Sequence, residues 1–124
     1  MTPKEEIKEL EDKITVINNR IKELKSSLGY NTIYFDNLTA KILKEYNVTI
    51  QDIVGRSKKY SIVKCRHVLI YLLRENTELT LNEIGKLVGN RHHATIIFAI
   101  SNVRGYVYVN DESILDMINF LTND

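Results

Sequence analysis

The chain has 124 residues, of which 44% are hydrophobic and 27% charged, and its formal net charge is +1. This length and composition are typical of one globular domain with an appendage. No run of about 18 apolar residues predicts a membrane span, and the charged start from Lys4 onward predicts no secretion signal. A single cysteine, Cys65, leaves no internal disulfide. We therefore expect a cytoplasmic protein.

The first predicted helix covers residues 2–28 and carries one narrow apolar stripe. Thr2, Pro3 and Glu5 form a capping box with proline at the first helical position. A stripe this narrow on an otherwise polar helix is typical of a coiled-coil strand. We therefore expect residues 1–29 to form an oligomerisation helix, as in a homodimer, through apolar residues at alternating gaps of three and four: Ile7, Leu10, Ile14, Ile17, Ile21, Leu24 and Leu28.

The direction of pairing stays open at this point. Isoleucine at one seam position and mostly leucine at the other favours a parallel dimer. A parallel homodimer brings Glu6 to Glu11 and Arg20 to Lys25, but each exposed like-charge pair costs only a few tenths of a kcal/mol. Antiparallel pairing, heterotypic pairing and packing of the helix onto its own domain are the alternatives.

Residues 30–124 predict a second unit made of helices. After Gly29 and a connection over residues 30–33, helices are expected over residues 34–46 and 49–54. Ser61 is expected to cap a longer helix that ends near Glu75. Its apolar stripe consists of Ile62, Cys65, Val68, Leu69, Leu72 and Leu73, and we expect Lys64, Arg66, His67 and Arg74 to lie outside that stripe.

The charge of this region is uneven. Residues 53–74 contain no acidic side chain, whereas the stretch after Gly105 has no basic one. Such a distribution favours a protein with one phosphate-facing side, and a solvated basic loop is the alternative. The basic residues are Arg56, Lys58, Lys59, Lys64, Arg66 and Arg74.

Residues 80–103 predict two helices joined by a glycine corner. Thr80 and Glu83 form a capping box, Gly89 ends the first helix, and the second begins near His92. In a helix-turn-helix, the second helix presents its first side chains to the DNA major groove. Most helix pairs of this kind do not bind DNA, but the polar first turn favours it. After the second helix of this pair, we expect the helical structure to be interrupted near Gly105 and a last helix to be capped by Asp111.

The motifs of catalysis are absent from the sequence. There is no GxxxxGK[ST] loop and no GxGxxG, so neither nucleotide nor dinucleotide binding is expected. His92 and His93, if both were helical, would point about 100° apart and would not share a metal ion. No acidic pair forms an evident acid–base couple. We expect neither enzymatic activity nor a metal or other cofactor.

From about Tyr34 onward the sequence resembles the C-terminal DNA-binding domain, domain IV, of the bacterial replication initiator DnaA. Residues 35–38, 45–46 and 50–54 resemble that domain's first helices, residues 56–59 its basic loop, and residues 64–67 its Arg-Pro-Arg-Gln-like string. Residues 81–85 are similar to its Leu-Pro-Glu-Ile-Gly, and residues 89–96 to its signature Gly-Gly-Arg-Asp-His-Thr-Thr-Val. The resemblance implies an all-α domain with a Trp-repressor-like helix-turn-helix over residues 30–124.

The resemblance also implies specific DNA contacts. A cation of the basic loop would enter the minor groove, and His93 and Thr95 would reach bases. Asn82 would lie near a phosphate at a helix N-terminus. The full set of expected DNA-binding residues is Arg56, Lys58, Lys59, Arg66, His67, Arg74, Asn82, Arg91, His92, His93, Ala94 and Thr95.

Several residues depart from the family pattern. His92 stands for the signature Asp, Ala94 for its first Thr, and Ser101 and Asn102 for basic residues, while Phe98 lies on the outer side of its helix. No ATPase module precedes the domain in this sequence, so we expect a stand-alone protein. We expect sequence-specific binding of double-stranded DNA that regulates replication initiation or transcription. The alternative is a protein-interaction module that binds a replication protein through the first helix.

Overall fold

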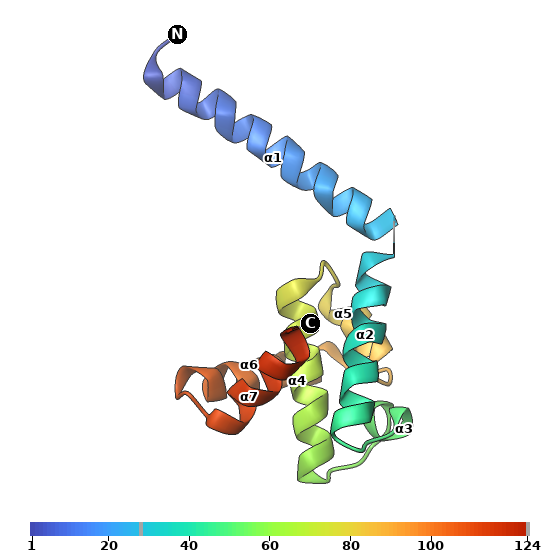
Figure 1. Cartoon of the computed structure of the whole chain (residues 1–124). Coiled ribbons are helices and arrows are strands. Elements are labelled where there is room, and N and C mark those ends of the chain that lie inside the picture. Colours follow the sequence, from blue (N-terminus) through green and yellow to red (C-terminus); the bar gives the residue numbers. More distant parts are fainter. Residues whose placement is uncertain (28, 124) are drawn as a thin grey trace.

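The computed structural model describes residues 1–27 and 29–123, and these form helices without a strand. The all-α expectation is therefore confirmed. In Figure 1 the first helix stands away from a compact body made by the other six. The helices are α1 (Pro3–Ser27), α2 (Tyr30–Glu45), α3 (Ile50–Val54), α4 (Tyr60–Asn76), α5 (Leu81–Leu87), α6 (His93–Tyr108) and α7 (Glu112–Thr122).

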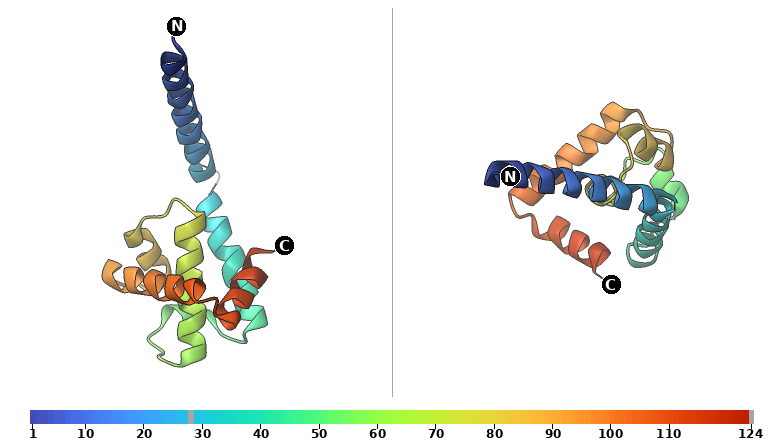
Figure 2. Two further views of the ribbon diagram at one scale, coloured as in Figure 1. Left: turned by 90° about the vertical axis from the view of Figure 1, so that its left-hand side faces the viewer. Right: turned by 90° about the horizontal axis from the view of Figure 1, so that it is seen from above.

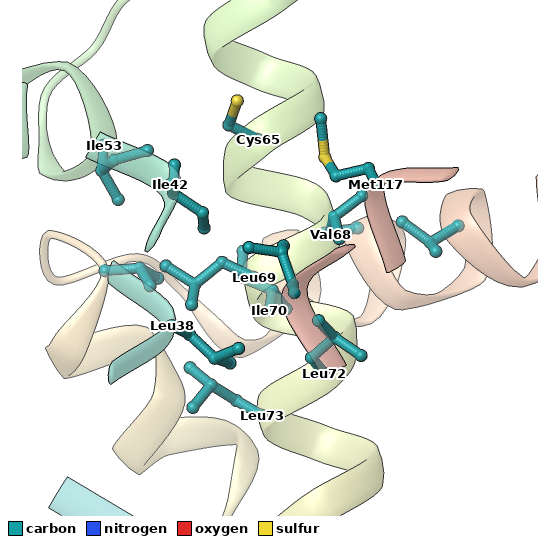
Figure 3. Close-up of a cluster of buried hydrophobic side chains, with 14 of the residues drawn as sticks. Leu38, Ile42, Ile53, Cys65, Val68, Leu69, Ile70, Leu72, Leu73 and Met117 are labelled. Carbon is teal, nitrogen blue, oxygen red and sulfur yellow. The ribbon is translucent and has the colours of Figure 1, made fainter. Parts of the chain in front are cut away.

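Helix α4 is the centre of the body. Helices α2, α3, α5, α6 and α7 all contact it, and the views in Figure 2 show α6 lying across it. Because other helices surround α4, it buries more side chains than its predicted apolar stripe contains, and Ile70 is one of these additional side chains. Figure 3 shows Leu38, Ile42 and Ile53 on one side of this helix and Met117 on the other. Each such side chain contributes roughly 1.5–3 kcal/mol when it is removed from water.

Local capping rules explain where several helices begin. Thr80 Oγ1 accepts a hydrogen bond from Glu83 N (3.1 Å), and Glu83 Oε1 accepts one from Thr80 N (3.0 Å). Thr49 and Asp52 make the same reciprocal pair before α3, and Asp111 caps α7 by accepting from Ile114 N. The predicted capping box at Thr80 and the predicted cap at Asp111 are confirmed.

The helix-turn-helix corner lies between α5 and α6 and packs tightly against α3. Gly89 has φ +99°, and a Cβ at this position would lie 2.1 Å from the carbonyl oxygen of Val54. A Cβ at Gly85 would lie 2.2 Å from the carbonyl oxygen of Arg91. Both positions therefore require glycine, and the predicted glycine corner is confirmed.

Three predicted boundaries were wrong. Residues 30–33 are helical, because α2 begins directly after the left-handed residue Gly29 (φ +70°). Ser61 lies inside α4, whose N-cap is Lys59 without a side-chain hydrogen bond. Helix α6 continues past Gly105 to Tyr108, because the packing of Tyr106 and Val107 on the core outweighs the ~1 kcal/mol cost of a helical glycine.

Helix α1 begins at Pro3, and its predicted seam faces solvent. Its described seam residues, Ile7, Leu10, Ile14, Ile17, Ile21 and Leu24, are each 44–57% exposed, and Leu28 lies outside the described residues. The contacts of α1 with the body lie near its C-terminal end, where Lys22 pairs with Glu78 (3.1 Å) and Lys25 lies over the Tyr30 ring. Within the described ranges, no helix is both long and apolar enough to cross a bilayer.

Candidate nucleic-acid interface

The basic loop, residues 55–59, connects α3 to α4 and exposes its cations. Arg56, Lys58 and Lys59 are all exposed. Ser57 Oγ accepts a hydrogen bond from Lys59 N (3.2 Å), which shapes the turn before α4. These three side chains are therefore accessible to a ligand, and their expected contacts with DNA stay a prediction.

Arg66 lies beneath this loop and is only 6% exposed. Its Nε donates to Ile53 O (2.7 Å), and its Nη2 donates to Asp52 O (2.8 Å) and Ser57 O (3.3 Å). Burial and the charge of Arg56 lower the pKa of Arg66, although the guanidinium keeps its carbonyl partners. The side chain holds the end of α3 and the loop in place.

The expectation that Arg66 lies outside the apolar stripe was therefore wrong. Arg66 stands four residues after Ile62 and three before Leu69, so helical geometry places it on the buried face. That spacing was the available signal. It was missed because arginine at such a position is exceptional unless carbonyl acceptors surround the guanidinium.

Arg91 joins the loop to the start of α6. Its Nη1 donates to the carbonyl oxygens of Val88 and Val54, and its Nη2 donates to that of Gly55. Burial, followed by the charges of Arg66 and Arg56, lowers the pKa of Arg91 to about 10, so it stays protonated at neutral pH. We call Arg66 and Arg91 the guanidinium pair.

The first turn of α6 is open to solvent. His92 is the N-cap, and its Nδ1 accepts a hydrogen bond from Ala94 N (3.1 Å), so a ring nitrogen takes the capping role that the Asp111 carboxylate has before α7. His93, Ala94 and Thr95 are exposed. The side chains that were expected to reach bases are accessible.

The expected 100° separation of the two histidines was wrong. The His92 and His93 ring centroids lie 4.1 Å apart, because His92 precedes the helix and has extended backbone. Among the described residues, no three His, Cys, Asp or Glu side chains gather as a metal site would need. The absence of a metal stays a prediction.

A second cationic flank lies on the other side of α6. Arg74 from the last turn of α4 lines one surface depression together with Asn82 of α5 and His93. The structure thus brings together three predicted DNA-binding residues from three helices. The basic loop adjoins the N-terminal end of α4 and Arg74 lies near its C-terminal end, so the two flanks are separated by about 20 Å of helix.

His67 is half-buried between α4 and α6. Its Nδ1 lies 3.2 Å from Asn102 Nδ2, and its ring packs edge-on against Phe98 with centroids 6.0 Å apart. Burial, and then the charges of Arg66 and Arg91, lower the pKa of His67, which favours the neutral ring as the acceptor from Asn102. The His67 ring is thus held in place by its contacts with α6 and is only partly exposed to solvent.

Comparison with known proteins identifies the same region. Residues 35–103 match the family described as bacterial dnaA protein helix-turn-helix. The chain is 36% identical over 103 residues to the chromosomal replication initiator protein DnaA of Borrelia duttonii, an alignment that covers 79% of this chain and 21% of that relative. It is 40% identical over 93 residues to the DnaA of Borreliella burgdorferi strain B31, covering 75% of this chain and 19% of the relative.

A third relative bears on α1. The DnaA of Borrelia garinii subsp. bavariensis is 34% identical over 120 residues, covering 92% of this chain and 25% of that protein. The unaligned part of this chain is shorter than α1, so the similarity includes part of that helix. The chain spans about a fifth to a quarter of the length of these curated relatives. The similarity to the helix-turn-helix family supports binding of DNA.

Proposed function

Because the chain belongs to the bacterial DnaA helix-turn-helix family, we propose that it binds double-stranded DNA sequence-specifically, with the first turn of α6 in the major groove. One observation carries this proposal. The exposed turn of His93, Ala94 and Thr95 lies between two cationic flanks, the basic loop and Arg74. A helix-turn-helix uses this arrangement, with base contacts at the start of the second helix and phosphate contacts on both sides.

Each part of this surface has its own role in the proposal. Arg56 extends from the basic loop toward the minor groove, whereas Lys58 and Lys59 contact phosphates. Arg74 with Asn82 receives a further phosphate. Thr95 places its methyl group against a thymine methyl, and His93 bonds a base edge. The guanidinium pair touches no DNA in this scheme, because its donors already bind carbonyl oxygens. It fixes the loop relative to α6.

The proposed biological role is regulation of replication initiation or transcription at initiator-type sites. The relatives at 34–41% identity are named as chromosomal replication initiator proteins, and a shared recognition helix favours related sites. We propose a binding role rather than a catalytic one, because the matched family is a helix-turn-helix. Competition with an initiator for its sites follows from this role.

The test is selection of bound duplexes from a random pool, followed by affinity measurements with variants. His93→Ala and Thr95→Ala are expected to reduce discrimination between the selected site and random duplex by about 1 kcal/mol each. Lys58→Ala is expected to weaken both duplexes equally, because phosphate contacts carry no sequence information. If no sequence is enriched even at low salt, sequence-specific binding is refuted. If all three variants weaken both duplexes equally, the assignment of α6 to the groove fails.

We further propose that α1 (within residues 1–29) pairs two copies of the chain, leaving residues 30–124 as the DNA-binding unit. Six apolar side chains of one stripe are exposed along α1, and their burial against a second copy is favourable because it removes apolar surface from water. Two copies on one DNA gain affinity through effective concentration. Antiparallel and heterotypic pairing are the competing outcomes.

Neighbouring valine and isoleucine residues provide a matched pair of variants for this test. Ile17 lies on the seam and is 57% exposed, whereas Val16 lies off it and is 67% exposed. Ile17→Lys is expected to convert the dimer to a monomer in sedimentation experiments, and Val16→Lys is expected to leave it a dimer. A wild-type chain that sediments as a monomer at all concentrations would exclude self-pairing. A dimer that Ile17→Lys leaves intact would place the contact elsewhere.

A further inference from the structure

Phe98 is the most prominent apolar side chain on the outward ridge of α6. The buried face of this helix consists of Ile96, Ala99, Ile100 and Val103. Phe98 lies nearly opposite that face, four residues after Ala94 and three before Ser101, and it is 64% exposed. Exposed apolar side chains that adjoin one another, as Phe98 and Ile97 (48% exposed) do, are candidates for a binding contact.

The ring is held in place before any partner arrives. His67 from α4 packs its edge against Phe98 at 80° between the ring planes, with centroids 6.0 Å apart. Asn102, one turn further along α6, lies at hydrogen-bond distance from His67 Nδ1 (3.2 Å). His67, which is itself held by Asn102, therefore supports the Phe98 ring, and most of that ring stays open to solvent.

The charges around this ridge favour nucleic acid as the partner. Helix α6 contains no acidic residue, and neither does the basic loop. Arg104 of α6 pairs with the carboxylate of Glu75 (2.8 Å) and so neutralises it. In a positive setting the partner is an anionic surface that also offers apolar groups. The major groove of DNA does so through the 5-methyl groups of thymine.

We propose that Phe98 is a specificity-determining residue that packs against a thymine methyl group in the major groove. This inference rests on the proposed DNA binding and deepens it. Phe98 lies one helical turn, about 6 Å, beyond Ala94 along α6, which corresponds to a shift of one to two base pairs. Ile97 is exposed on the adjoining side (48%), so the ridge offers a short apolar strip where polar side chains are usual in recognition helices.

The experiment uses the intact chain and the duplex selected from the random pool. Each thymine is replaced in turn by uracil, which removes only the 5-methyl group. Wild-type protein is expected to lose about fourfold in affinity at the thymine that Phe98 contacts, the value of burying one methyl group. In Phe98→Ala this loss is expected to disappear, so that the two changes are not additive. Phe98→Leu keeps an apolar side chain and is expected to retain part of the loss.

Tyr108 provides the matched control, since it is an exposed aromatic residue on the same helix (87%) at its far end. Tyr108→Ala is expected to leave the uracil profile unchanged. If Phe98→Ala keeps the wild-type profile, or weakens every duplex equally, the inference is overturned while DNA binding stands. If wild-type protein binds no duplex, the proposed function fails and the inference with it. Loss of a protein partner with unchanged DNA binding would assign Phe98 to a protein contact instead.

Discussion

The basic loop and the guanidinium pair belong to the same positively charged region, yet they have opposite environments. Lys58 and Lys59 extend into solvent, whereas Arg66 and Arg91 direct their donors at backbone carbonyl oxygens from residues 52–57 and 88. A dense run of cations in a sequence therefore need not form one binding surface. Here one set of charges is exposed for a ligand, and the other holds that set in position.

The largest effect on stability is expected when a buried guanidinium is removed. Arg66→Ala leaves the carbonyl oxygens of Asp52, Ile53 and Ser57 without their donor in a site that water barely reaches. We expect the free energy of unfolding to fall by about 3 kcal/mol, measured by urea denaturation.

The control for this loss is Arg74→Ala, which removes an exposed arginine from the same helix. It is expected to change stability by no more than about 0.5 kcal/mol. Equal effects of the two substitutions would mean that the buried hydrogen bonds contribute nothing particular, and the division between the two sets of cations would be lost.

The salt dependence of DNA affinity distinguishes the exposed cations from the buried ones. Lys58→Ala and Lys59→Ala are each expected to reduce the slope of log K against log salt by ~0.9 without altering stability, because each removes one phosphate contact. Lys8→Ala on α1, also an exposed lysine, is the control and should leave the slope unchanged. Arg66→Gln removes the charge but keeps a hydrogen-bond donor, and it is expected to keep the wild-type slope; a reduction as large as that of Lys58→Ala would place Arg66 on the DNA.

The smallest expected effect concerns pH and His67, which lies next to the guanidinium pair. Its folded-state pKa is lowered, so below its ordinary value near 6.5 the unfolded chain binds more protons than the folded one. Stability is therefore expected to be constant above pH 7 and to decline as the pH falls through 6.5. Thermal melts of His67→Gln should show a weaker decline over the same window, and an identical decline would assign it to another group.

The sequence predicted the features that depend on neighbouring residues. The capping box at Thr80 needs only Glu83 three residues on, and the corner at Gly89 needs only a glycine after a short amphipathic helix. The spacing of Arg66 indicates its buried face, but its hydrogen-bond partners were not predictable in this way, because they lie 9–14 residues away in α3 and the basic loop. Similarly, the stripes of α1 and α4 both show helical spacing, yet one is exposed and the other is the core.

Helix α1 is a rod of about 37 Å that stands away from the body. If two α1 helices pair as proposed, their length sets the distance between the two DNA-binding bodies. Parallel pairing sets both bodies at one end, which suits half-sites in adjacent helical turns, about 34–36 Å apart. Antiparallel pairing sets them at opposite ends and requires a longer interval. The distance between half-sites on a footprinted promoter or origin would therefore report the direction in which two α1 helices lie.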